Sequence, residues 1–243
     1  MLEWLLAPVD PAVAHDVGGY LSWHARSMVL AWGVLVPFGI FVARYFKVLP
    51  GQDWPRALDN HVWWNTHRIC QYTACALMIV GLWLILNAGT ITFRPGPHSL
   101  IGWAALALAL VQITGGILRG TKGGPTDPSP DGTLRGDHFD MTPRRLIFEY
   151  IHKSAGYVAL AFAVAAILTG LWQANAPNWM WLSLVLWWAA LLLVSVFLQR
   201  RGMAVDTYQA IWGPDPRLPG NQRKPIGLGV SRRSKNNDMP GSA

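Results

Sequence analysis

Long runs of hydrophobic residues recur along the chain and are separated by shorter polar segments. Each run has close to the roughly 20 residues that an α-helix needs to cross the hydrocarbon core of a membrane. In chain order the runs cover residues 21–46, 63–87, 98–118, 148–172 and 178–198. The pattern predicts an all-α integral membrane protein with five transmembrane helices in one domain, residues 21–199.

Polar segments flank this predicted domain on both sides. Residues 1–20 contain an apolar stretch that is too short to span a membrane, so we expect an extracytoplasmic surface segment. Residues 200–243 form a basic tail. Beyond about Gly213 the tail is rich in Pro, Gly, Asn and Arg, and this composition predicts partial disorder.

The connection between the third and fourth runs is the longest one. Residues 120–143 are rich in Gly, Pro and Asp and predict a coil. The segment ends in Thr142 followed by Pro143, which are typical of the cap and the first residue of a helix. We therefore expect the fourth helix to start near this point.

Composition agrees with a membrane protein. Hydrophobic residues make up 52% of the chain and charged residues only 14%, whereas a soluble domain has about 25% charged residues. The net charge is +7, but the basic residues lie mainly in the connections and the tail. They are interpreted as determinants of membrane topology, so we expect lipid contact and no nucleic-acid partner.

Lys and Arg are unevenly distributed among the connections. The first and third connections and the tail are rich in these residues, whereas no Lys or Arg precedes Arg26. The positive-inside rule then predicts that the N-terminus lies outside and the C-terminus lies in the cytoplasm. The absence of a basic N-terminal region also predicts that there is no cleaved signal peptide.

Four histidines lie near the heads of the first four predicted helices: His24, His67, His98 and His152. Because successive helices alternate in direction, His24 and His98 are expected toward the outer face. His67 and His152 are expected toward the cytoplasmic face. In an up-down four-helix bundle the first helix stands diagonally opposite the third, and the second opposite the fourth. Each layer of the bundle therefore offers two imidazoles that face each other.

Two facing imidazoles without a carboxylate or thiolate are typical of axial ligands to a b-type haem. Zinc normally takes four protein ligands, and each layer supplies only two. No Cys-x-x-Cys-His motif occurs, so the two predicted haems are held without covalent links. If the apolar core is about 30 Å thick and each histidine lies roughly one turn inside it, the irons are on the order of 20 Å apart.

Residues around the four histidines fit the same hypothesis. Gly102 and Gly156 each follow a histidine by four residues and leave room for a flat macrocycle. Basic residues near the helix heads are candidates to pair with haem propionates or an anionic electron donor: Arg26, Arg68, Arg144, Arg145 and Lys153.

The other histidines carry less weight. His15 and His138 lie in polar connections, and His61 precedes the second helix. His61 is the alternative to His67 if that helix begins earlier. A single histidine in a membrane helix can also be a hydrogen-bonded core residue, but the repetition over four helices favours ligands.

With these residues in place, the chain resembles the cytochrome b561 and ferric reductase transmembrane family. The resemblance covers residue 21 to about 198. It depends on the four histidines together with these motifs: His24-Ala-Arg-Ser-Met28, Ala31-Trp32, Ala43-Arg44-Tyr45, Gln71, Gly102 and Glu149 to Tyr157.

The resemblance implies a di-haem protein that carries electrons across a membrane. The first and third histidines would hold one haem, and the second and fourth the other. Family members commonly take electrons from ascorbate on the cytoplasmic side and deliver them to monodehydroascorbate or ferric chelates on the other side. Basic residues near the cytoplasmic haem serve the donor, a role that the resemblance assigns here to Arg68 and Lys153.

The chain departs from six-helix members, in which the histidines occupy helices two to five instead of one to four. An N-terminal helix and a fused electron-donor domain are therefore expected to be absent. Quinol or a separate redox partner subunit is an alternative donor, and the lack of eukaryotic targeting signals favours a bacterial inner membrane.

Three functions follow as hypotheses. The first is a transmembrane electron conduit with oxidoreductase activity at its ends. The second is a haem-bearing anchor subunit that links a partner dehydrogenase to the quinone pool. The third is a non-redox proton or metal transporter, which the scarcity of Asp and Glu inside the spans disfavours.

Overall fold

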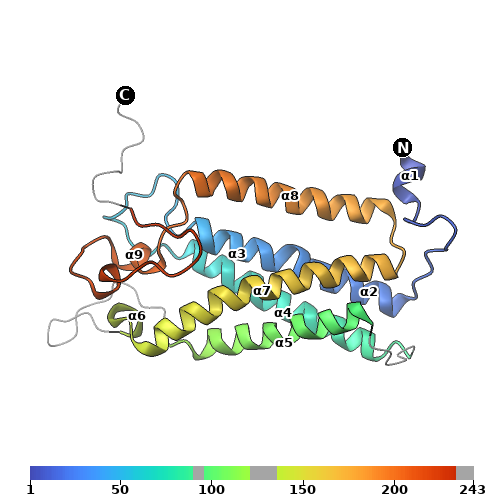
Figure 1. Ribbon diagram of the computed structural model, residues 1–243, viewed down its shortest axis with the longest axis horizontal. Coiled ribbons are helices and arrows are strands. Elements are labelled where there is room, and N and C mark those ends of the chain that lie inside the picture. The colour runs from blue at the N-terminus through green and yellow to red at the C-terminus, as the bar shows by residue number, and fades with distance from the viewer. Residues whose placement is uncertain (90–95, 121–135, 234–243) are drawn as a thin grey trace. The chain divides into compact units, whose positions relative to one another are not determined.

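The computed structural model describes residues 1–89, 96–120 and 136–233 (Figure 1). The chain divides into two compact units. The first unit contains Met1–Phe41, His67–Leu110 and Tyr157–Val194. The second unit contains Val42–Thr66, Val111–Gly156 and Ser195–Ala243.

Within the described residues, five helical segments are long and apolar enough to cross a membrane, which confirms the predicted fold class. They are Gly19–Tyr45, α4 (Val62–Leu86), α5 (Pro97–Leu118), α7 (Pro143–Gln173) and α8 (Asn178–Arg200). The first segment consists of α2 (Gly19–Met28), the π-helix η1 (Val29–Leu35) and α3 (Val36–Tyr45).

Helix α7 begins at Pro143, before the hydrophobic run that starts near residue 148. The side chain of Thr142 accepts a hydrogen bond from the amide of Arg145 at 3.4 Å, as expected for a helix cap. The hydrophobic run therefore marks only part of the helix, because the first turns carry polar residues. Most of the predicted coil at 120–143, residues 121–135, lies outside the described residues.

The first span contains a π-helical segment next to a proline. Pro37 has no N–H to donate to the carbonyl of Gly33, four residues earlier. The indole Nε1 atoms of Trp187 and Trp188 on α8 donate to that carbonyl instead, at 3.0 and 2.9 Å. The proline thus frees an acceptor, and α8 satisfies it. This pair of hydrogen bonds attaches α8 to the first span.

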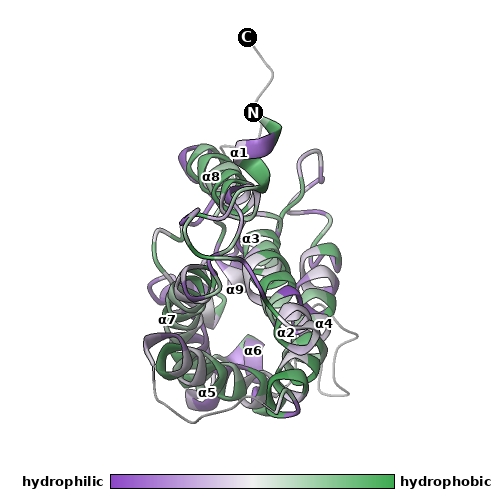
Figure 2. Cartoon of the chain, turned by 90° about the vertical axis from the view of Figure 1, so that its right-hand side faces the viewer, coloured by the Kyte–Doolittle hydropathy of each residue, from purple (hydrophilic) through white to green (hydrophobic). Residues whose placement is uncertain are grey.

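Small residues dominate the core of the first unit, where Ala31, Ala74, Ala105 and Ala163 are almost fully buried. Lipid tails supply no hydrophobic force between membrane helices, so the helices associate through close van der Waals packing. Small side chains allow this close approach. Figure 2 looks along the helices, with α2, α4, α5 and α7 around a common centre and α8 outside it near α1 (Leu2–Leu6).

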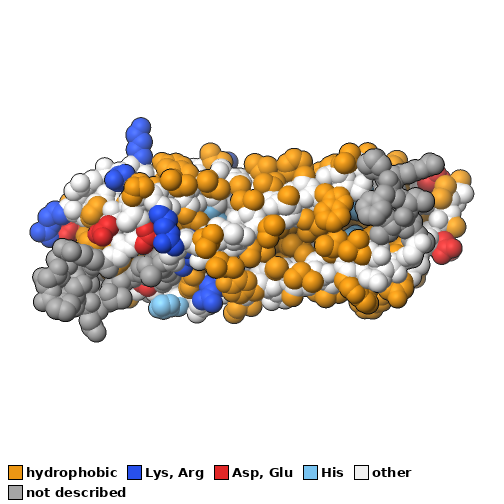
Figure 3. All heavy atoms as spheres, turned by 90° about the horizontal axis from the view of Figure 1, so that it is seen from below, with side chains coloured by type: hydrophobic (Ala, Val, Ile, Leu, Met, Phe, Trp, Pro, Cys, Tyr) orange, Lys and Arg blue, Asp and Glu red, His pale blue; other side chains and the backbone are white. Residues whose placement is uncertain are grey.

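The outward surfaces of the long helices are apolar. Leu193, Trp172 and Ile79 expose most of their side chains. Figure 3 shows hydrophobic side chains over the helices, and Lys and Arg gathered over the second unit. Exposed apolar surface of this extent on membrane-length helices is lipid-facing surface. The chain is an integral membrane protein.

Three short helices form a compact part of the second unit: α6 (Asp137–Asp140), α9 (Thr207–Trp212) and the 3₁₀-helix η2 (Pro219–Gln222). The ring of Tyr208 stacks on His138 with centroids 5.5 Å apart, and its hydroxyl donates to the carbonyl of Phe139 at 2.7 Å. Tyr208 and Ile211 are fully buried. This small apolar centre lies outside the membrane spans.

The structure describes the tail beyond Gly213 as far as residue 233. Side chains from the long helices hold its main-chain carbonyls. Arg44 donates to Leu228 at 2.6 Å, and Lys153 donates to Ile226 at 2.8 Å. These contacts come from residues far away in the sequence, and the partial disorder of the tail stays a prediction. Residues 234–243 lie outside the described part of the chain.

Candidate functional site

The imidazoles of His24 on α2 and His98 at the head of α5 face each other in the first unit. Their ring centroids are 6.4 Å apart and their planes are perpendicular. Both side chains are half-buried. The predicted pair of the outer layer is therefore brought together, although its role as a ligand pair stays a prediction.

Each of these two rings is held through Nδ1 by a main-chain carbonyl of a neighbouring helix. Nδ1 of His24 lies 2.8 Å from the carbonyl oxygen of Gly81 on α4. Nδ1 of His98 lies 2.9 Å from the carbonyl oxygen of Ala166 on α7. A carbonyl can only accept, so Nδ1 carries the proton and Nε2 carries the lone pair. This is the arrangement that orients imidazoles for a metal.

Glycines on the neighbouring helices make these close approaches feasible. A Cβ atom added at Gly170 would lie 2.9 Å from Cε1 and 3.0 Å from Nδ1 of His98. A Cβ atom added at Gly81 would lie 3.1 Å from Met28. Sequence reasoning missed both glycines. The sequence shows each of them only as a glycine within a hydrophobic run, and it does not indicate which helix the glycine faces.

The geometry fits the axial ligation of a haem iron. Metal–imidazole bonds are about 2 Å long, so two imidazoles on opposite sides of one metal have ring centroids about 6 Å apart. A Cβ atom added at Gly102 would meet nothing within 4 Å. Within the described ranges, no group of three or more His, Cys, Asp or Glu side chains is placed to hold a metal ion.

His67 on α4 shows the same arrangement in the first unit. Its Nδ1 lies 3.1 Å from the carbonyl oxygen of Gly39. A Cβ atom added at Gly39 would lie 2.7 Å from Nε2 of Gln71 and 2.9 Å from Cβ of Cys70. Three of the four predicted ligands therefore share one hydrogen-bond pattern. His61, the alternative to His67, lies one residue before α4 and is exposed.

His152 on α7 belongs to the second unit and has a different partner. Its Nδ1 lies 2.6 Å from the side-chain amide of Gln112 on α5. Its ring stacks on Phe148 with centroids 4.9 Å apart. Gly156, predicted to leave room for a macrocycle, faces the same amide, since an added Cβ atom would lie 3.7 Å from Oε1 of Gln112. The sequence did not single out Gln112.

The predicted anion-binding residues have varied surroundings. Arg26 and Arg68 are exposed, and each lies over an aromatic ring one helical turn away. Lys153 donates to Glu149 at 3.2 Å and to the tail. Arg145 is buried and donates to Glu149 at 2.9 Å. None of these contacts tests whether the residues bind a cofactor or a donor.

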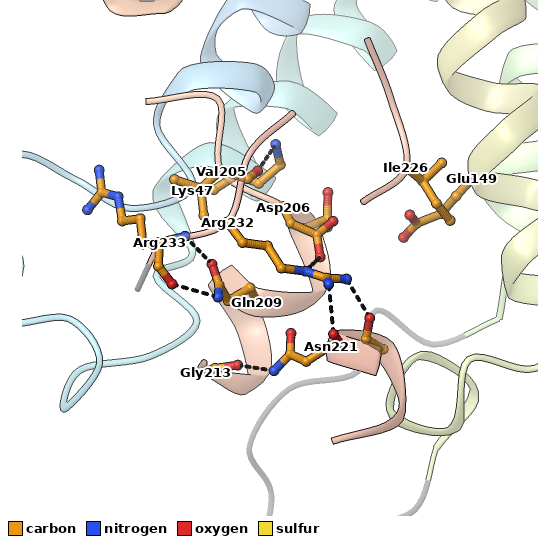
Figure 4. Close-up of polar contacts among 12 residues, drawn as sticks. Lys47, Glu149, Val205, Asp206, Gln209, Gly213, Asn221, Ile226, Arg232 and Arg233 are labelled. Carbon is orange, nitrogen blue, oxygen red and sulfur yellow. Dashed lines mark hydrogen bonds and ion pairs between the residues drawn. The ribbon is translucent and has the colours of Figure 1, made fainter. Parts of the chain in front are cut away.

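A buried polar cluster in the second unit was not anticipated (Figure 4). Lys47 is 6% exposed and donates to the carbonyl of Val205 at 3.1 Å. Burial lowers the pKa of Lys47 to about 7, and it raises the pKa of Asp206. His138 is fully buried, and burial together with the nearby Arg145 lowers its pKa to about 3.

Five membrane-length helices among the described residues, with a perpendicular pair of imidazoles in the first unit, define an integral membrane protein of the helical-bundle type. No family model and no solved structure matches the chain. An Arabidopsis thaliana protein named for cytochrome b561, DM13 and DOMON domains is 30% identical over 164 residues, which are 67% of this chain and 16% of that protein.

Two further relatives are similar. Ferric-chelate reductase 1 of Bos taurus is 29% identical over 62% of this chain and 22% of its own length. An Arabidopsis thaliana protein named for cytochrome b561 and DOMON domains is 26% identical over 66% of this chain and 35% of its own length. The chain thus spans a minor part of these relatives. It belongs to the cytochrome b561 and ferric reductase transmembrane family, and this membership implies that it binds haem b.

Proposed function

We propose that the chain carries electrons across a membrane through two b haems, each held between two histidines. His24 and His98 hold the outer haem, and His67 and His152 hold the haem on the cytoplasmic side. The observation that carries the proposal is the perpendicular pair of His24 and His98 with ring centroids 6.4 Å apart. Both rings are also held through Nδ1 by carbonyls, which suits ligation through Nε2.

The proposal for the second haem depends on the order of the histidines along the chain. His67 lies in the first turns of α4, whereas His152 lies further inside α7, which begins at Pro143. These two helices are expected to run in the same direction. Nδ1 of His67 also faces a carbonyl, that of Gly39. A bound b haem supplies a one-electron couple. The chain holds and orients it, and the apolar core around it excludes water.

Electrons are proposed to pass from a reductant in the cytoplasm to an acceptor outside. The basic connections support a C-terminus in the cytoplasm by the positive-inside rule. Arg68 and Lys153 are candidates to receive an anionic reductant, such as ascorbate. The name of the bovine relative, ferric-chelate reductase, supports a ferric chelate as the acceptor. A bacterial inner membrane is the proposed location.

The direct test is haem content in purified variants. Reduced wild-type protein is expected to show the absorbance of two low-spin b haems per chain. His24→Ala and His98→Ala should each remove one haem and leave the other. His67→Ala and His152→Ala should remove the second one. His15→Ala is the matched control and should keep both haems, because Nδ1 of His15 lies 2.7 Å from the carbonyl of Ala174 in an exposed loop.

Two results would contradict this account. The first is a wild-type protein without haem that conducts protons or metal ions, which would favour a transporter. The second is haem loss in the His15→Ala control. Co-purification of a dehydrogenase, together with no reductase activity of the isolated chain, would favour the anchor-subunit function. In that case the haem assignments hold and the proposed acceptor fails.

A further inference from the structure

His152 differs from the other predicted ligands in what holds its ring. Nδ1 of His24, His67 and His98 lies between 2.8 and 3.1 Å from a main-chain carbonyl oxygen. Nδ1 of His152 lies 2.6 Å from the side-chain amide of Gln112. A carbonyl only accepts hydrogen bonds, whereas an amide offers both an acceptor and a donor. The tautomer of His152 therefore depends on the orientation of Gln112.

Hydrogen bonding within the protein favours one orientation of this amide. With its nitrogen toward His152, the amide donates to Nδ1 at 2.6 Å and to the carbonyl oxygen of His152 at 3.1 Å. Its oxygen then accepts from the amide N–H of Gly156 at 2.9 Å. This orientation satisfies all of these groups. It requires a lone pair on Nδ1, so the proton of a neutral ring is on Nε2.

Ligation of iron through Nε2 requires the opposite orientation. Nδ1 must then carry the proton, and the amide oxygen must accept it. After this half-turn the oxygen also faces the carbonyl oxygen of His152, and the amide nitrogen faces the N–H of Gly156. Two contacts between like groups weaken the hydrogen bond. The ring itself has little freedom to adjust, because Phe148 stacks on it with an interplanar angle of 27°.

We propose that Gln112 is the positioning residue of His152 and that its amide oxygen accepts the Nδ1 proton when His152 is a haem ligand. This inference rests on the proposed function.

The proposal implies that a side chain tunes the reduction potential of the cytoplasmic haem. A hydrogen bond to Nδ1–H makes a ligating imidazole more basic, and a more basic ligand stabilises ferric iron and lowers the reduction potential. Main-chain carbonyls supply this bond to His24, His67 and His98, and a substitution does not remove a main-chain carbonyl. At His152 a side chain supplies it, in a weakened form. The potential of this haem therefore depends on Gln112.

The test compares Gln112→Leu and Gln112→Glu in purified, haem-loaded full-length protein. Haem per chain and the two midpoint potentials are measured by optical redox titration. Gln112→Leu removes the acceptor, so one haem should bind about tenfold more weakly, and its potential should rise. Gln112→Glu presents an acceptor in both orientations, so both haems should be retained and the same potential should fall. The other haem should be unchanged in both variants and reports that they are folded.

Ser154→Ala is the matched control on α7. Ser154 is exposed, and its hydroxyl donates to the carbonyl of Tyr150 at 2.7 Å, so both potentials should equal those of the wild type. A wild type with fewer than two haems would defeat the proposed function. A wild type with two haems, of which His152→Ala loses one, would sustain it. Wild-type haem content and potentials in both Gln112 variants would then overturn the role of Gln112 alone.

Discussion

Nδ1 of His24 lies 2.8 Å from the carbonyl oxygen of Gly81 on α4, whereas the ring of His24 faces an imidazole on α5. That facing ring, His98, is in turn held by the carbonyl of Ala166. The proposed outer site therefore ties together four helices of the first unit: α2, α4, α5 and α7. Because main-chain atoms hold both rings, the site depends on the spacing of the helices more than on any single side chain.

Gly170→Ala should disturb this spacing. The new methyl group would lie 2.9 Å from Cε1 of His98, so the ring must shift. We expect about tenfold weaker haem binding at the outer site, as is usual when the support of a metal ligand is altered. Gly116→Ala on α5 is the control, since an added Cβ atom there meets nothing within 4 Å. Haem titration of the two apo-proteins compares them, and equal affinities would contradict the arrangement.

Glu149→Gln should destabilise the protein strongly. The carboxylate of Glu149 is 4% exposed and pairs with Arg145 at 2.9 Å and with Lys153 at 3.2 Å. Loss of its charge leaves buried Arg145 without its counter-charge, which costs about 3–5 kcal/mol in comparable pairs. In Asp53→Asn the partner is the exposed Arg56 at 3.7 Å, so the change should stay within about 1 kcal/mol. Denaturant unfolding in detergent measures both, and equal effects would refute the prediction.

Lys47 should make stability depend on alkaline pH. Burial lowers the pKa of Lys47 from 10.5 to about 7. Between these two values the unfolded chain binds more protons than the folded chain, so the free energy of unfolding should rise with pH. Lys47→Met should abolish this rise, and exposed Lys224→Met should retain it. Melting temperatures from pH 7 to 10 provide the measurement. A rise that persists in Lys47→Met would assign it to another group.

His138 should produce a dependence of the same sign at acidic pH. Burial lowers the pKa of His138 from 6.5 to about 3, so the folded state holds the neutral ring. As the pH falls through this window the unfolded state takes up the proton first, and stability is lost. His138→Phe should remove this acid sensitivity and keep the stacking on Tyr208. Among the described residues, neither ring nitrogen of His138 has a hydrogen-bond partner, so Phe should not lower stability at pH 7. His61→Phe, at an exposed position, should keep the wild-type acid profile.

The transmembrane helices were predictable because bilayer thickness fixes their length. An apolar run of that length indicates a transmembrane helix. The four histidines were also predictable as candidates, since each is a polar residue at the head of an apolar run. Helix direction then paired them, and the structure brings His24 and His98 together. Their role as haem ligands stays a prediction.

The partners of these histidines were not predictable from the sequence. Gly81, Ala166 and Gly39 act through main-chain carbonyls, and every residue has one. Gln112 is one polar residue in an apolar run, and only the packing of α5 beside α7 shows that it contacts His152.

The contacts of the tail were not predictable for a related reason. They involve side chains far away in sequence, such as Arg44 and Lys153, which bind tail carbonyls. The composition of a segment indicates how little apolar surface it has, but it does not indicate which hydrogen-bond donors from other parts of the chain contact it.

Reductive titration of the purified wild-type chain, with haem counted against protein, tests the central claim most directly. The account predicts two low-spin b haems per chain that are reduced in two one-electron steps. A chain that binds one haem or none, or whose haems are high-spin and therefore lack a second histidine ligand, would contradict it.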